Sequence, residues 1–267
     1  MRPFHFTLII ILALTAGLSL RADIVKIPNG IEHTDWDLLL QQYVDKDGLV
    51  DYAGWHQSKE DRRRLDVYLA QFAKIGLEPD QQPLDYRVAA LNNLYNALTI
   101  QWMLENFPVE SIRKTDNPWK KARHPVGGRL VTLDEVEHET LRPDISWKVH
   151  SMVVCAARSC PPLLDRAFLP ETWEAQMEER YRSWFARVDL NTFNRESKTV
   201  TISKIFDWYG EDFTGEDSLR EVIRRYAPES EQAWLKETKF RIRYMDYHWG
   251  LNAQSDIGKD FKNSWFF

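Results

Sequence analysis

The hydrophobic residues of this 267-residue chain recur mainly at the spacing of α-helices, with shorter apolar or alternating runs that indicate strands. We predict helices over residues 34–43, 58–75, 85–107, 132–142, 171–187, 203–210 and 219–226. We predict strands over residues 150–156, 188–190, 199–202 and 240–244, and a short extended segment over residues 49–55. No internal repeat or low-complexity linker divides the chain. The pattern therefore predicts a single mixed α+β domain from about residue 23, mainly helical around a small β-sheet.

The predicted helix over residues 85–107 is apolar on nearly every side, which is typical of a helix buried within the domain. Its middle nevertheless holds Asn92, Asn93 and Asn96. An unpaired buried amide costs roughly 1–3 kcal/mol, so each of these side chains needs a hydrogen-bond partner. Two interpretations follow. The asparagines tie neighbouring loops to the helix, or Asn93 and Asn96 belong to a functional site.

Both cysteines lie within residues 150–164, HSMVVCAARSCPPLL. The apolar part predicts a buried central strand, and the proline pair that follows predicts a rigid loop. Cys155 then faces a packed sheet, whereas Cys160 lies on the loop, where reactive groups are commonly placed. We predict that Cys160 is the nucleophile if the protein has one. A disulfide between the two cysteines is an alternative that this strand geometry disfavours.

A capping box of Thr132 and Glu135 begins the helix over residues 132–142, and Pro143 is predicted to end it. Glu137 lies in the middle of the apolar face of this helix, where a carboxylate requires a partner. His138 projects at the border of that face, within reach of a neighbouring loop. The pair is the best companion for Cys160 that the periodicity offers. Alternatively, Glu137 pairs with a structural arginine and His138 is an ordinary surface residue.

Together, these residue types form the pattern of a thiol nucleophile with its base and an orienting group. Cys160 would attack a carbonyl, His138 would serve as base, and Glu137 or Asn96 would orient the imidazole. His150 is the reserve base. Pro161 has no N–H, so an oxyanion hole would have to use backbone amides of residues 158–160 or the side chains of Asn93 or Asn96.

Other chemistries find less support in the sequence. His138 and Glu139 begin a zinc-binding HExxH motif, but residue 142 is arginine and the second ligand is missing. The chain contains no Walker loop and no dinucleotide fingerprint. We therefore expect neither a metal nor a cofactor. The net charge of −5 and the pI near 5.9 give no reason to expect a nucleic-acid partner.

The N-terminus joins Arg2, an apolar run over residues 6–14 and small residues up to Ala22. This layout predicts a secretory signal peptide over residues 1–22, followed by a domain over residues 23–267. An uncleaved anchor is the alternative, because Arg21 disturbs the cleavage site. We expect a periplasmic or secreted protein with no stable membrane insertion after cleavage.

Aromatic residues make up 13% of the chain and serve either core packing or a substrate groove.

Five separated segments resemble the family known as domain of unknown function 547: residues 93–98, 126–142, 150–163, 203–213 and 244–252. Their order and spacing are similar to those of the family from about residue 40 to 255. The polar positions that the resemblance carries over are Asn93, Asn96, Glu137, His138, Ser159, Cys160, Trp208, Asp212 and Asn252. The chain departs from the family pattern at Leu91-Asn92 and at His248, where aspartate is common. The family name implies no activity, but its Glu-His pair and Ser-Cys-Pro-Pro turn support the pairing of Cys160 with His138.

We therefore expect an extracytoplasmic thiol-dependent hydrolase or acyltransferase that acts on a small molecule, a peptide or a cell-envelope component. The alternative is a non-catalytic module that binds a peptide or glycan of the cell envelope in an aromatic groove. The candidate histidine precedes the cysteine in the chain, opposite to the papain order. A cysteine-protease-like scaffold, a permuted one and an unrelated one all stay open.

Overall fold

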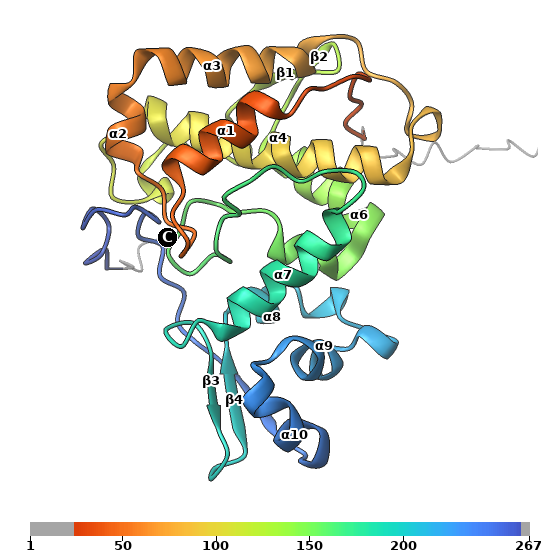
Figure 1. Ribbon diagram of the computed structural model, residues 1–267, viewed down its shortest axis with the longest axis vertical. Coiled ribbons are helices and arrows are strands. Elements are labelled where there is room, and N and C mark those ends of the chain that lie inside the picture. Colours follow the sequence, from red (N-terminus) through yellow and green to blue (C-terminus); the bar gives the residue numbers. More distant parts are fainter. Residues whose placement is uncertain (1–23, 263–267) are drawn as a thin grey trace, which may run out of the picture.

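The computed structural model describes residues 24–262, so the predicted signal peptide lies outside the described residues (Figure 1). The first half contains α1 (Thr34–Tyr43), α2 (Tyr52–Gln57), α3 (Lys59–Ala70), η1 (Gln71–Ala73), η2 (Pro79–Gln81), α4 (Leu84–Glu105), η3 (Ile112–Lys114), β1 (His124–Val126) and β2 (Arg129–Val131). The second half contains α5 (Leu133–Val136), η4 (Glu137–Leu141), α6 (Arg142–Ile145), η5 (Ser146–Ser151), α7 (Trp173–Ala186), β3 (Thr192–Asn194), β4 (Thr199–Ile202), α8 (Ile205–Trp208), η6 (Gly210–Asp212), η7 (Gly215–Asp217), α9 (Leu219–Tyr226), α10 (Glu229–Glu237) and β5 (Arg241–Tyr244). This is an α+β fold, mainly helical, as the sequence predicts.

Helix α4 is the centre of the larger part of the molecule and packs against α2, α3, α5, α6 and α7. Its side chains are buried on all sides from Arg87 to Ile100, as the apolar pattern predicts. The buried guanidinium of Arg87 forms an ion pair of 2.8 Å with Asp144 of α6. Figure 1 shows α4 passing behind α1, with α3 above both helices and α7 crossing below.

A smaller part of the molecule lies beyond α7 and contains a three-stranded sheet with the order β3-β4-β5. Strand β4 is antiparallel to β3 and parallel to β5. In Figure 1 the β3-β4 hairpin projects away from α1–α4, with α9 and α10 beside it. Stacked aromatic side chains join α7 to α8 (Ile205–Trp208) and α9 (Leu219–Tyr226); they are Tyr181, Trp184, Phe185, Phe206 and Tyr226.

Two asparagines of α4 hold the long connection between η5 and α7. The Asn96 side chain donates to the carbonyl of Met152 (2.9 Å) and accepts from the N–H of Val154 (2.9 Å). The Asn93 side chain makes the same pair of bonds with the carbonyl (2.8 Å) and the N–H (2.9 Å) of Phe168. The interpretation in which the asparagines tie loops to the core helix is confirmed for Asn93 and Asn96, whereas the Asn92 side chain donates to the Val88 carbonyl of its own helix.

The prediction of a central strand over residues 150–156 is wrong. The chain forms η5 up to Ser151 and is irregular from Met152, with one isolated bridge between Ala157 and Leu251. The run is buried, as a strand would be, but the Asn96 amide takes the two hydrogen bonds that a neighbouring strand would supply. An unbroken run of apolar residues indicates that a segment is buried. It does not show whether the backbone of that segment bonds to a neighbouring strand or to side chains.

Three smaller differences have local causes. Residues 52–57 form α2 instead of an extended segment, because Asp51 caps the helix by accepting from the N–H of Gly54. The first strand of the hairpin lies at residues 192–194, and Val188, which the sequence places in that strand, is 82% exposed. Helix α10 is unpredicted, since its polar composition gives only a weak apolar stripe.

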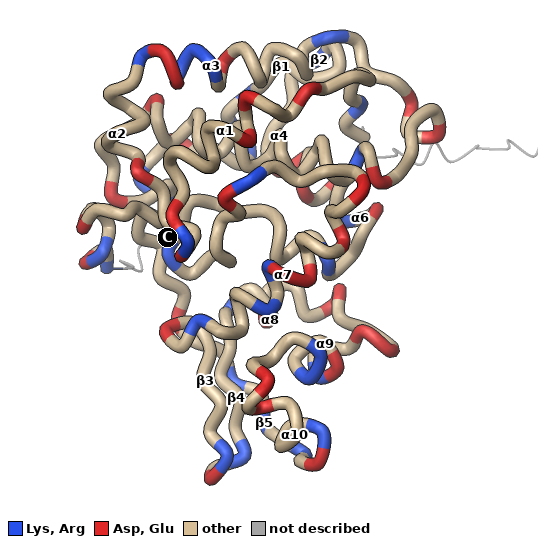
Figure 2. The backbone as a smooth tube through the Cα atoms, in the orientation of Figure 1, with Lys and Arg blue, Asp and Glu red and all other residues tan. Residues whose placement is uncertain are grey.

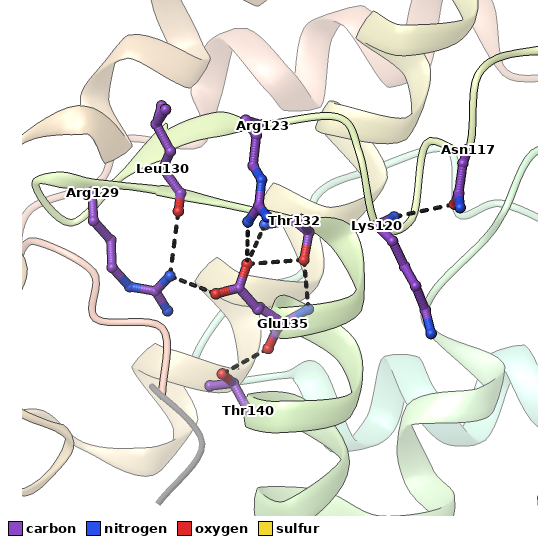
Figure 3. A network of polar contacts seen from close by, with 8 residues as sticks. All are labelled: Asn117, Lys120, Arg123, Arg129, Leu130, Thr132, Glu135 and Thr140. Atoms are coloured by element: carbon purple, nitrogen blue, oxygen red, sulfur yellow. Dashed lines mark hydrogen bonds and ion pairs between the residues drawn. The ribbon is translucent and has the colours of Figure 1, made fainter. Parts of the chain in front are cut away.

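The capping box at the start of α5 is confirmed and is extended into a larger network (Figure 3). The Glu135 carboxylate accepts from the N–H of Thr132 (2.7 Å) and from Arg129 (2.6 Å), with Arg123 at 3.4 Å. The Thr132 hydroxyl in turn accepts from the N–H of Glu135 (3.2 Å). At the far side of the turn, the Thr140 hydroxyl donates to the Glu135 carbonyl (3.0 Å). This network fixes the entry into the turn that carries Glu137 and His138.

The segment that follows, η4, is a π-helical turn, and α5, η4 and α6 run on as one continuous helix to Ile145. Pro143, which the sequence predicts as the end of the helix, lies in the first turn of α6. Within a π turn the hydrogen bonds shift by one residue, as in the bond from the Arg142 N–H to the Glu137 carbonyl. The ring of Pro143 is therefore accommodated next to the π turn and does not end the helix there.

Figure 2 shows that acidic and basic residues are interspersed along the chain, including on α3 and α7. Within residues 24–262, no helix has both the length and the apolar character needed to cross a membrane.

Asn96→Ala should lower the free energy of unfolding by about 2–5 kcal/mol, because it leaves the buried carbonyl of Met152 and N–H of Val154 without partners. Urea unfolding followed by circular dichroism measures this loss. Asn106→Ala is the matched control, since Asn106 is exposed at the end of α4 and should change stability by less than about 0.5 kcal/mol. Equal effects of the two variants would contradict the bracing role of Asn96.

Candidate active site

A cavity of about 520 Å³ lies where η4, η5, the 152–160 loop, α8 and the 247–249 segment meet. The groups in its wall that can react or titrate are Tyr95, Lys120, Asp134, Glu137, His138, His150, Cys155, Cys160, Tyr209 and Tyr247. Three tryptophans, Trp119, Trp208 and Trp249, contribute further aromatic surface. Segments far apart in the sequence thus place most of the predicted site residues around one space.

Both cysteine thiols are free, and their Sγ atoms lie 2.8 Å apart. The cysteines form no disulfide, as the sequence analysis favours, but the geometric argument for this is wrong. It rested on the strand, and the chain instead turns at Ala156, whose φ is 58°. This left-handed conformation is uncommon for a residue with a Cβ and is a feature often found at functional sites. The turn directs Cys155 and Cys160 toward each other.

Several donors surround the sulfur of Cys160. The N–H of Cys155 lies 3.2 Å from Cys160 Sγ, and the Tyr247 hydroxyl lies 3.0 Å from it. The turn at Ala156 sets successive backbone groups around one point, an arrangement that favours an anion. The sequence alone does not reveal this set of donors, because Tyr247 is distant in the chain and the turn depends on tertiary contacts.

These donors shift the pKa values of the two thiols in opposite directions. Burial raises the pKa of the Cys160 thiol, but hydrogen bonds from Cys155 and Tyr247 and from the backbone of Ala157 and Cys155 outweigh it, so the pKa is lowered. The hydrogen bond with Cys160, together with burial, raises the pKa of Cys155 well above its ordinary value. Burial also raises the pKa of Tyr247, which therefore keeps its proton to donate. Of the two sulfurs, Cys160 is therefore the one that ionises more readily.

The loop is held from outside by the C-terminal segment. The backbone N–H groups of Arg158, Ser159 and Cys160 donate to the carbonyls of Gly250, His248 and Ala157, respectively. The Ser159 hydroxyl accepts from the N–H of His248 (2.8 Å), and the N–H of Asn252 donates to the Ala156 carbonyl (3.0 Å). These amides, which the sequence offers as oxyanion donors, are therefore already bonded.

His150 is the most firmly oriented imidazole of the cavity. Its Nε2 lies 2.6 Å from Asp212, its ring stacks on Tyr209 with centroids 4.3 Å apart, and its side chain is 1% exposed. Asp212 is also held by two bonds from Arg142, at 2.7 and 2.8 Å. Burial raises the pKa of Asp212, but hydrogen bonds from His150 and Arg142 outweigh it and lower the pKa to about 2. The carboxylate thus stays charged and fixes the ring.

His138 is less constrained. Its Nε2 lies 3.7 Å from Asp134, its Nδ1 is buried without a hydrogen-bond partner among residues 24–262, and its ring lies 5.8 Å from that of Tyr209. The neighbouring Glu137 is buried, and its carboxylate interacts with the phenol of Tyr95. Burial and the Glu137 charge raise the pKa of Tyr95 well above its ordinary value.

Of the six residues predicted for the site, Cys160, His138, Glu137 and His150 line the cavity. Asn93 and Asn96 do not line it, and their amides are bonded to the backbone. Residue-by-residue reasoning gave no role to Cys155, Asp212 or Tyr247. Only the family resemblance pointed to Asp212.

Across the described part of the chain, no group of three or more His, Cys, Asp or Glu residues is arranged to hold a metal ion.

Comparisons with known proteins agree with the resemblance seen in the sequence. No curated protein and no solved structure matched the chain. Residues 80–185 match the family model described as protein of unknown function, DUF547. This range contains α4, η4, both cysteines and both candidate histidines, whereas Asp212 and Tyr247 lie beyond it. The match over this segment supports a member of the DUF547 family.

Proposed function

We propose that this protein is a thiol-dependent hydrolase or acyltransferase in which Cys160 is the nucleophile. The observation that carries the proposal is the set of donors around Cys160 Sγ, at 3.0 Å from Tyr247 and 3.2 Å from the Cys155 N–H, in the wall of a 520 Å³ cavity. A thiolate is the reactive form of cysteine, and hydrogen bonds to it keep it ionised. The enzyme therefore needs no imidazole in contact with the sulfur to form its nucleophile.

The reaction begins when Cys160 Sγ attacks the carbonyl carbon of an ester or amide. The bond to the leaving group breaks, a thioester forms, and the leaving group takes a proton from a protonated imidazole in the cavity, which becomes neutral. In the second step the same imidazole removes a proton from water, or from an acceptor alcohol or amine. The activated acceptor then attacks the thioester and restores the thiolate.

We assign the proton transfers to His150 ahead of His138. Its Nε2 is held by Asp212 as the imidazole of a catalytic triad is held by its carboxylate, and no described residue bonds to its Nδ1. His138 stays a candidate, because it lines the same cavity. The Tyr209 hydroxyl is a donor for the developing oxyanion, since it lines the cavity and burial raises its pKa.

We place this activity outside the cytoplasm, in the periplasm or beyond the cell. The support is the signal-peptide layout of residues 1–22.

The first test uses p-nitrophenyl acetate and mass spectrometry of the intact, reduced protein. We expect the wild type to form an acetyl thioester on Cys160 that is then hydrolysed. Cys160→Ser should form no adduct, whereas Cys155→Ser should still form it. His150→Ala should slow turnover by about 10²–10⁴-fold, the usual contribution of a general acid or base. His138→Ala is the matched comparison and should slow it less. An adduct that forms equally in Cys160→Ser would overturn the proposal.

A second candidate function, a binding module for a cell-envelope glycan, is supported by the aromatic wall of the cavity. Trp208 stacks on Trp249 (5.9 Å between centroids) and lies 4.9 Å from Tyr247. Trp119 meets Trp249 edge-on at 6.0 Å. Trp208 is 45% exposed, which is unusual for so large an apolar side chain and leaves its face open to a sugar ring. In this function Cys160 would not react.

Trp208→Ala should weaken the binding of soluble peptidoglycan fragments several-fold, because an aromatic contact is worth about 0.5–1.5 kcal/mol. Isothermal titration calorimetry measures the affinity. Trp234→Ala, which removes a tryptophan that packs on Phe240 away from the cavity, should leave it unchanged. Binding that is insensitive to Trp208 would remove the support for this function.

A further inference from the structure

We propose that Cys155 and Cys160 form a reversible disulfide, which makes the cavity a thiol–disulfide exchange site for low-molecular-weight disulfides. This activity goes beyond acyl transfer and requires only the two thiols. Its starting point is the 2.8 Å separation of the two Sγ atoms, both of which line the cavity. An S–S bond is about 2.05 Å long, so bond formation needs a movement of less than about 1 Å.

The loop already has the conformation that brings the thiols together. The left-handed turn at Ala156 lies between them, and the loop is held on one side by Asn96 and on the other by Asn252. Oxidation therefore does not require the loop to refold. The 267 residues contain two cysteines, so no third thiol among them competes for either sulfur.

The surroundings assign different roles to the two sulfurs. Cys160 is 4% exposed and receives the hydrogen bonds that keep a thiolate, whereas Cys155 is more exposed and keeps its proton. Cys160 is thus the attacking sulfur. Cys155, next to it, is the resolving sulfur, which attacks the mixed disulfide from the shortest distance available in the protein.

The exchange takes place in two balanced steps. The Cys160 thiolate attacks one sulfur of a disulfide RSSR, forming a mixed disulfide and releasing RS⁻, which takes up a proton from solvent. Cys155 then loses its proton to solvent and attacks Cys160 Sγ, releasing the second RS⁻, which also takes up a proton from solvent. In sum, the two protein thiols are oxidised to one disulfide and RSSR is reduced to two RSH.

This exchange would also regulate the proposed acyl transfer, because the disulfide occupies the nucleophile. That consequence rests on the proposed function, whereas the exchange does not. An oxidising compartment would keep the protein in the disulfide form until a thiol reduced it.

The test incubates the reduced protein with glutathione disulfide, blocks remaining thiols with N-ethylmaleimide and measures the intact mass. We expect the wild type to lose both maleimide additions and to retain no glutathione. Cys155→Ser should stop at one glutathione on Cys160, and Cys160→Ser should react at least about tenfold more slowly. A wild type that retains glutathione, or that keeps both thiols free, would overturn the inference.

A second measurement avoids the variants and therefore does not depend on their folding. Trypsin cleaves after Arg158, between the two cysteines, so only a disulfide can join residues 149–158 to residues 159–166. We expect this joined pair from the oxidised wild type and its absence after reduction. Absence of the pair from protein treated with glutathione disulfide would also overturn the inference. If the acetyl thioester on Cys160 forms but the disulfide-joined peptides do not, the exchange alone is overturned. If the joined peptides form but the acetyl thioester does not, the proposed function alone is overturned.

Discussion

The structure of the site depends on one side-chain amide. Asn96 of α4 bonds both the carbonyl of Met152 and the N–H of Val154, and all three residues are buried, so losing either bond would leave a buried polar group unpaired. This pair of bonds holds the start of the loop against the most buried helix of the domain. The loop can therefore keep the left-handed turn at Ala156, and that turn brings the thiols of Cys155 and Cys160 together. A structural residue in the core thus determines the chemistry of a residue that it does not contact.

The sequence predicted those parts of the fold that leave a periodic signal. The buried nature of α4 and the Thr132–Glu135 capping box were both visible, because they depend on residues within a few turns of each other. The predicted strand over residues 150–156 was wrong for a physical reason. An apolar run indicates burial, and the hydrogen-bond partner of this run was the side chain of Asn96 on α4, 58 residues away from Val154 in the sequence. The meeting of Cys160 with Tyr247 could not be predicted, since no local pattern encodes a contact between distant loops.

The two imidazoles illustrate the same limit. The sequence favoured His138 because it adjoins the buried Glu137. In the structure, the ring of His150 is held more firmly than that of His138, because its Nε2 lies 2.6 Å from Asp212. The partner of His150 lies on η6, and its ionised state depends on Arg142 of α6, so three separate elements are needed to orient one ring. Catalysis would then divide between a thiolate kept ionised by its own loop and an imidazole that moves protons. Neither group has to activate the other.

The central claim is that hydrogen-bond donors of the loop and of Tyr247 ionise Cys160 without an imidazole. The direct measurement is the thiolate absorbance near 240 nm of the reduced protein as a function of pH, with Cys160→Ser subtracted. The account predicts half-ionisation below the ordinary thiol pKa of about 8.5, unchanged in His138→Ala and His150→Ala and raised in Tyr247→Phe. Half-ionisation at or above the ordinary thiol pKa would contradict the account. So would a pKa that rises in His138→Ala or His150→Ala but stays unchanged in Tyr247→Phe.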